Sequence, residues 1–218
     1  MSSLRRARSL KQRAGLHERA GDYPKAAQDL VDALDEPENP YQADCHRALA
    51  EVLWMSPGAD ERVKKKALQS VEAAARVSPD YVEKFAAFLI NRTDEDGLIL
   101  LARHFVAVKD VRLPSSVRVP MLRFAATAGR RRNVEPKERL DWLNEALGLK
   151  DGSGADDEAL ADLHSMRGII LNNLGRFADA KRDLQALQTL VDRHANDSGA
   201  WQALRKNALN LKNALSGK

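Results

Sequence analysis

The chain has 218 residues, of which 44% are hydrophobic and 30% are charged, and its formal net charge is +4. This composition is typical of a folded domain and excludes a largely disordered chain, while no apolar run approaches the roughly 18 residues that span a bilayer. Aromatic residues are only 5% while alanine and leucine are abundant, and this composition favours an all-α fold. The single cysteine, Cys45, excludes an internal disulfide and fits a cytoplasmic protein.

The first segment predicts an antiparallel helical hairpin over residues 4–36. Residues 4–20 have helical periodicity, Gly21-Asp22 indicates a tight turn, and a second helix from Tyr23 carries its alanines and leucines on one face. The sequence "DEPENP" ends that helix, because proline cannot continue an α-helix.

The same pattern returns near the end of the chain. "GDYPKAAQDLVDAL" at 21–34 and "GRFADAKRDLQALQ" at 175–188 share a glycine, an aromatic residue two places on and an alanine five places on. Similar helix endings recur at intervals of 41, 33, 39 and 41 residues, and periods of this length are typical of stacked helical repeats. We therefore expect a single domain over 1–218, with five hairpins and a capping helix at about 4–36, 40–77, 80–109, 114–149, 156–193 and 197–216.

The middle hairpins carry helix-start signals. Thr93 is predicted to be the N-cap of a helix, with Asp96 three residues on. The acidic runs "TDED" and "ADDE" stand where helices begin, so we interpret them as caps rather than as catalytic pairs. In the fourth hairpin Pro114 suits a first helical turn, whereas Pro120 is expected to kink the helix or delay its start.

The last segment has one apolar stripe with spacings of 3, 4, 3 and 4 residues. The stripe consists of Trp201, Leu204, Ala208, Leu211 and Leu215. A helix with one apolar and one polar face suits the end of a repeat stack, and pairing with another helix is the alternative.

These residues resemble the tetratricopeptide repeat family. The second half of the first unit fits its pattern with Gly21, Tyr23 and Ala26, and the last unit fits with Gly175 and Phe177. The middle units keep only fragments of the pattern, and their longer periods also fit another helical-hairpin repeat. The resemblance implies a right-handed α-solenoid of about five antiparallel hairpins, whose concave face, lined by the first helices, binds a peptide or a partner's helix.

The resemblance also implies which side chains line that concave face. Lys11 falls on a lysine position with which some family members grip a carboxylate, but Gly15 and His46 stand where asparagines are needed, so that clamp is incomplete. In the last hairpin the partner-binding positions are Ser165, Met166, Ile169, Asn172 and Asn173. Helix capping at the "NNLG" turn is the alternative role for the two asparagines.

Nothing in the sequence indicates catalysis. The five histidines stand in separate predicted helices or helix ends, without a second histidine or cysteine at i+3 or i+4. There is no HExxH, GxSxG or phosphate-binding glycine loop. We therefore expect no catalytic residues, metal or cofactor, and a non-catalytic adaptor or scaffold with a protein or peptide partner.

Charge is unevenly distributed and leaves two alternatives open. Residues 1–16 hold five bases and no acid, residues 17–61 hold eleven acids and three bases, and residues 99–134 hold eight bases and one acid. A nucleic-acid-binding surface would use six of the eight basic residues of the last region. These are Arg112, Arg118, Arg123, Arg130, Arg131 and Arg132. The other alternative is a homo-oligomer in which the acidic 17–61 surface of one copy meets the basic 99–134 surface of another. A module that serves a catalytic partner belongs to the same alternative.

Overall fold

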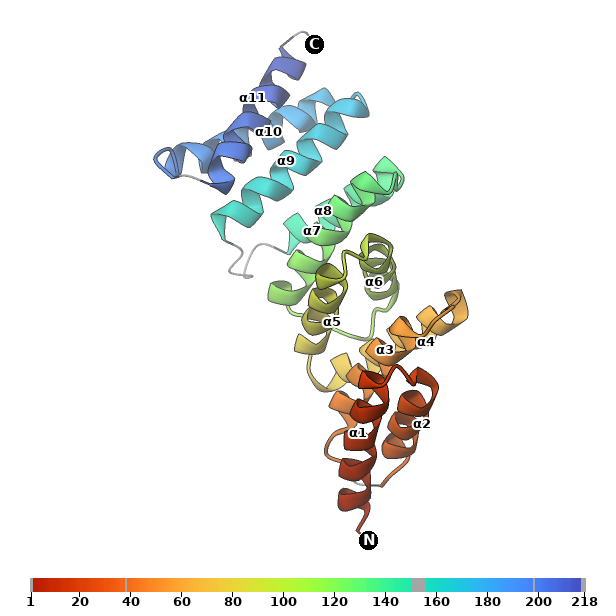
Figure 1. Ribbon diagram of the computed structural model, residues 1–218. Coiled ribbons are helices and arrows are strands. Elements are labelled where there is room, and N and C mark those ends of the chain that lie inside the picture. Colours follow the sequence, from red (N-terminus) through yellow and green to blue (C-terminus); the bar gives the residue numbers. More distant parts are fainter. Residues whose placement is uncertain (1, 38, 150–155, 198, 217–218) are drawn as a thin grey trace. The chain divides into compact units, whose positions relative to one another are not determined.

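The computed structural model describes residues 2–37, 39–149, 156–197 and 199–216, and over these it is all-helical, with eleven helices and no strand (Figure 1). The all-α prediction is therefore confirmed. None of these helices is long and apolar enough to cross a membrane.

The chain divides into two compact units, Met1–Leu113 and Pro114–Lys218. The helices of the first unit are α1 (Ser3–Arg19), α2 (Tyr23–Leu34), α3 (Gln42–Met55), α4 (Glu61–Val77), α5 (Asp80–Asn91) and α6 (Glu95–Ala107). Those of the second unit are α7 (Ser115–Arg131), α8 (Pro136–Gly148), α9 (Asp157–Asn173), α10 (Phe177–Arg193) and α11 (Ala200–Leu215). Within each unit every helix packs against the next one in the chain, and α11 also packs against α9.

Aspartates begin several of these helices. Asp22, Asp60, Asp94 and Asp156 each accept a hydrogen bond from the backbone N–H three residues on, at 2.7 to 3.3 Å. A carboxylate in this position satisfies a free helix donor and complements the helix dipole. Asp94 lies in "TDED" and Asp156 in "ADDE", so the interpretation of these acidic runs as caps is confirmed.

The prediction that Thr93 is an N-cap is wrong. Thr93 has φ +53° and the next residue, Asp94, is the cap. Thr93 instead occupies the left-handed position that ends α5, and the N–H of Asp94 donates to the carbonyl of Leu89 at 3.0 Å. This six-to-one hydrogen bond is the mark of a Schellman ending, which needs a positive φ at the residue before the donor.

The same ending joins four helix pairs. Gly21, Thr93, Asn133 and Gly175 have φ values of +75°, +53°, +56° and +75°. In each case the next N–H donates to the carbonyl five residues back, at 2.8 to 3.0 Å. This ending requires a positive φ, which glycine adopts without strain. The two sequence repeats share a glycine at this position, whereas the two middle pairs have threonine and asparagine there.

Pro120 lies inside α7 and does not delay its start, because the helix begins at Ser115 directly after Pro114. That part of the prediction is wrong. Pro120 removes one backbone donor from the helix, and the 17-residue helix tolerates that loss.

Buried side chains form the core of each unit. In the first unit the thiol of Cys45 is fully buried among residues of α1, α2 and α3, including Leu10, Leu30 and Leu49. In the second unit the predicted apolar stripe of α11, from Trp201 to Leu215, is buried. Leu211 of that stripe packs over Gly168 of α9, where an added Cβ would lie 2.6 Å from its Cδ2.

Candidate binding groove between α7 and α9

Side chains of α7 and α9 contact each other beside a pocket that residues of α7, α8 and α9 line, and these contacts and the pocket are together called the α7–α9 groove. The hydroxyl of Thr127 donates to Sδ of Met166 at 3.5 Å, and Nη1 of Arg123 lies 3.8 Å from Oδ2 of Asp162. Arg130 follows Arg123 on α7 by about two helical turns, so the two residues lie on the same face of that helix. The two helices thus contact each other through these side chains, one turn apart on each helix.

The pocket has a volume of about 100 Å³ and lies near the C-terminal ends of both helices. The pocket is lined by Ala126, Arg130, Arg139, Leu143, Met166, Ile169, Ile170 and Asn173. Pockets for drug-sized small molecules have volumes of roughly 300 to 1,000 Å³. The size of this pocket therefore suits one side chain of a larger partner.

Two arginines bring positive charge to this apolar pocket. Nε of Arg139 donates to the carbonyl of Val134 at 3.1 Å. Burial, and next the charge of Arg130, lower the pKa of the Arg139 guanidinium. At the other end of the groove, burial raises the pKa of Asp162, against the opposing effect of Arg123. The pocket end of the groove is thus cationic.

The structure brings three of the predicted partner-binding residues together in this pocket, namely Met166, Ile169 and Asn173. Ser165 lies in the core with 1% of its surface exposed, so it is not available to a partner. The side-chain oxygen of Asn172 is buried and has no hydrogen-bond partner among the described residues. Helical spacing accounts for this separation, since 165 and 172 are one helix position away from the stripe 162, 166, 169 and 173.

Lys11 lies in the first unit and is engaged within it. Its Nζ is 2.8 Å from Oδ2 of Asp44 and 5.0 Å from the ring centre of Tyr41. The other oxygen of Asp44 accepts a hydrogen bond from the hydroxyl of Tyr81 at 2.9 Å. Lys11 also lines an open depression of about 680 Å³ on α1, in which no atom lies within 4 Å of the position of a Cβ on Gly15.

The basic residues of 99–134 do not form one free surface. Arg118 pairs with Glu145, and Arg123 lies near Asp162. Arg130, Arg131 and Arg132 are exposed at the end of α7, whereas Arg112 is exposed in the first unit. Sequence alone did not indicate that Arg130 and the unpredicted Arg139 would line a pocket.

Three bases of residues 1–16 form ion pairs with acids of residues 17–61 inside the first unit. Arg6 pairs with Glu36 at 2.9 Å, Lys11 with Asp44 at 2.8 Å, and Nη2 of Arg13 with Asp29 at 2.5 Å. Bases of α1 thus neutralise acids that follow them in the chain.

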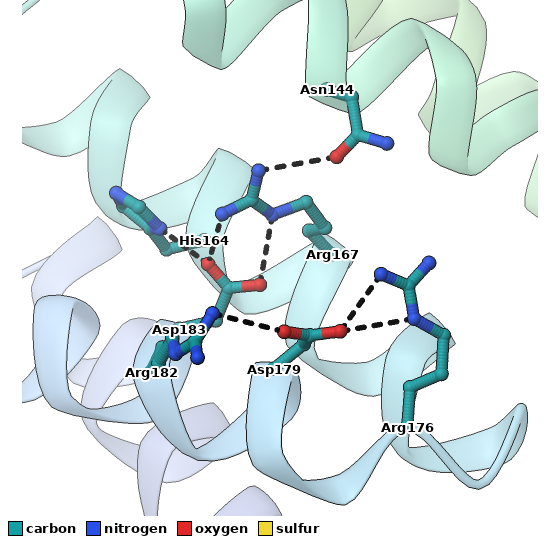
Figure 2. Close-up of polar contacts among 7 residues, drawn as sticks. All are labelled: Asn144, His164, Arg167, Arg176, Asp179, Arg182 and Asp183. Carbon is teal, nitrogen blue, oxygen red and sulfur yellow. Dashed lines mark hydrogen bonds and ion pairs between the residues drawn. The ribbon is translucent and has the colours of Figure 1, made fainter.

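Sequence reasoning missed a buried ionic cluster between α9 and α10 (Figure 2). Asp183 is 1% exposed and accepts from Nε and Nη2 of Arg167 at 2.9 and 2.7 Å, while Nδ1 of His164 lies 2.7 Å away. Nη1 of Arg167 also donates to Asn144 of α8 at 3.2 Å. These hydrogen bonds, together with the charges of Arg167 and His164, hold the pKa of Asp183 below its usual value although burial opposes this.

The histidines occupy separate sites. His104 lies 2.8 Å from Glu72, and His194 contacts Asp197 at 2.7 Å and Asp157 at 3.1 Å. Nδ1 of His46 is buried without a partner among the residues that the structure describes, and burial lowers the pKa of its imidazole. Within the ranges that the structure describes, no three His, Cys, Asp or Glu side chains come together as a metal site would require.

No known protein-family model matches the chain, and no curated protein resembles it in sequence. The class of protein is thus defined by the structure alone: the described residues form an all-helical protein with a small pocket that is apolar and cationic.

Proposed function

We propose that this protein is a non-catalytic adaptor or scaffold that binds a peptide, or a helix of a protein partner, along the α7–α9 groove. The observation that carries this proposal is the pocket in which Met166, Ile169 and Asn173 meet. Apolar side chains surround a space that suits one partner side chain, and an exposed amide at the rim can bond to a peptide backbone.

The repeated architecture supports the same proposal. We infer that the helix pairs are tetratricopeptide-like antiparallel hairpins stacked as a right-handed solenoid, with α11 as the cap of its last pair. The recurring Schellman endings and the α11 stripe that packs against α9 and α10 support this arrangement. In such a stack α7 and α9 are the first helices of successive hairpins, so their groove lies on the concave, partner-binding side. A reducing, cytoplasmic setting suits the buried free thiol of Cys45.

The test is an affinity capture from nuclease-treated lysate that compares wild type with Met166→Glu and with Lys181→Glu. Met166 lines the pocket, whereas Lys181 is exposed on α10 and serves as a matched surface control. We expect a partner that wild type and the control retain and the Met166 variant loses, and that protects α7 and α9 from hydrogen exchange. Equal capture by all three proteins, or protection elsewhere in the chain, would contradict the proposal.

A nucleic-acid partner is the second candidate, favoured by the three consecutive exposed arginines Arg130, Arg131 and Arg132. Phosphate contacts would make binding to a bare oligonucleotide fall steeply with salt. Titration of a fluorescent single strand at 50 and 200 mM salt decides between the two candidates. Binding that is lost at the higher salt, together with a capture that nuclease abolishes, would favour nucleic acid.

A further inference from the structure

We propose that the pocket of the α7–α9 groove selects acidic peptides: it takes one aliphatic side chain, while Arg130 and Arg139 bind the carboxylate of an aspartate or glutamate beside it. This inference rests on the proposed function and names the chemistry of its ligand. Arg130 and Arg139 both line the same pocket. A peptide that carries an aliphatic and an acidic side chain close together matches both features at once.

Two cations side by side in a partly apolar site repel each other, and an anion relieves that repulsion. The main effects on the pKa of Arg139 are burial and the charge of Arg130, and both lower it. A bound carboxylate would reverse the second effect, because opposite charges within a few ångströms stabilise the charged form. Asp162 is not among the residues that line the pocket and lies 3.8 Å from Arg123; burial raises its pKa, while the charges of Arg123 and then of Arg130 lower it.

Arg139 is already held in place for such a contact. Its stem packs against Gly129, where an added Cβ would lie 3.1 Å from its Cδ, and its Nε donates to the carbonyl of Val134. Little side-chain freedom is therefore lost when a ligand binds, which favours affinity. Arg130 is exposed and supplies the second, adjustable donor.

The lining also favours a peptide over a nucleic acid. None of the eight residues around the pocket is aromatic, whereas single-stranded nucleic acids are held largely by bases stacked on aromatic rings. The aliphatic walls come from Leu143, Met166, Ile169 and Ile170. A leucine, isoleucine or methionine side chain gains most from such walls, while a ribose or a phosphate gains nothing from them.

The experiment is a selection of random 12-residue peptides against the full chain, followed by fluorescence anisotropy with one selected peptide. We expect selected peptides to carry Asp or Glu within four residues of Leu, Ile or Met. The selected peptide is then compared with its Glu→Gln form on wild type, on Arg130→Gln and on Lys137→Gln, an exposed cation of α8 outside the pocket. Charge-assisted hydrogen bonds predict a roughly tenfold to hundredfold loss of affinity for the acidic peptide on Arg130→Gln, and almost none for the Gln peptide.

Each of the remaining outcomes would overturn the inference for a different reason. Aliphatic peptides without an acid preference, whose binding is lost on Met166→Glu, would overturn the acidic chemistry and leave the proposed groove intact. Selection of no peptide at all would overturn the acidic-peptide inference, and the capture experiment would then decide whether the groove binds a helix of a protein partner. Displacement of the peptide by a single-stranded oligonucleotide of equal charge would show a phosphate site instead. An equal loss on Lys137→Gln would show a diffuse charge effect rather than a bound carboxylate.

Discussion

Arg167 reaches from α9 to Asp183 of α10 and holds both of its carboxylate oxygens, sixteen residues apart in the chain. Arg13 of α1 and Asp29 of α2 have the same relationship, also sixteen residues apart, with bonds of 2.7 and 2.5 Å. The first and last repeats therefore share an arginine clasp between their two helices as well as the glycine turn.

Breaking the clasp is expected to destabilise the second unit strongly. Arg167→Ala leaves the buried Asp183 with His164 alone, and removal of one partner from a buried ion pair costs about 3 to 5 kcal/mol. Urea unfolding followed by circular dichroism measures the loss. Arg182→Ala is the control, because Arg182 is 81% exposed in its pair with Asp179 and should change stability by less than about 1 kcal/mol. A loss on Arg167→Ala no larger than that of the control would contradict the clasp.

The clasps also predict acid sensitivity. The pKa of Asp29, bonded to Arg13, and the pKa of Asp183 both lie below the usual value. A carboxyl with a lowered folded-state pKa contributes stability above its unfolded pKa of about 3.9, and that stability is lost as pH falls through the folded value. Stability should therefore decline below about pH 4, and Asp183→Asn should flatten the decline. The variant Asp192→Asn, at an exposed position of α10, should keep it.

The docking of α11 is expected to weaken as pH rises. Hydrogen bonds to Asp197 and then to Asp157 raise the pKa of His194, whose ring stacks on Trp201 with 4.1 Å between ring centres. A raised folded-state pKa gives stability that is complete below the unfolded value of about 6.5 and is lost as pH rises through the folded value.

Trp201 reports this transition directly, since a protonated imidazole stacked on the indole changes its fluorescence. The fluorescence titration should show a midpoint above 6.5, and His194→Gln should abolish it. Trp54 and Trp142 also emit, so Trp201→Phe is the control that identifies the signal. A titration that survives Trp201→Phe would refute the assignment.

Two glycine-to-alanine changes should have opposite signs. Gly168→Ala places a methyl group 2.6 Å from Cδ2 of the buried Leu211, so this side chain or α11 must shift, at a cost of about 1 to 3 kcal/mol. Gly15→Ala meets no atom within 4 Å inside α1 and should stabilise by about 0.5 to 1 kcal/mol. Thermal unfolding of both variants checks the signs, and a neutral Gly168→Ala would mean that α11 moves freely.

Thr93→Gly is expected to stabilise the first unit by about 1 kcal/mol. Thr93 is a β-branched residue at φ +53°, a conformation that glycine adopts without strain. Asn133→Gly at φ +56° is the matched comparison and should change less, because asparagine tolerates this region. Chemical denaturation of the two variants tests the difference, and an equal response would show that the side-chain type is irrelevant there.

Periodicity predicted the helices well, because apolar spacing and aspartate caps are local signals. Asp80–Asn91 and Asp157–Asn173 begin within one residue of the predicted hairpin starts at 80 and 156. Thr93 was misplaced because a threonine before an acid fits a cap and also fits a left-handed ending, and only the i→i−5 bond to Leu89 separates the two.

The site was harder to predict, because it depends on helices that are distant in sequence. The stripe of Met166, Ile169 and Asn173 follows from helical spacing, but Arg139 of α8 joins it only through packing. The clasp left a visible signal, since Asp29 and Asp183 hold the same place in the two repeated segments and each has an arginine sixteen residues earlier. Because both carboxylates are buried, the shared spacing of sixteen residues indicates an ion pair between the two helices of each repeat.

The position of Cys45 gives the first unit a built-in kinetic reporter. Its thiol is fully buried between α1, α2 and α3, and burial raises its pKa, so an alkylating reagent reaches a reactive thiolate only when these helices separate. As the chain has one cysteine, the labelling rate counts the openings of that unit alone. The opening of the first unit can thus be timed by alkylation in an unmodified protein.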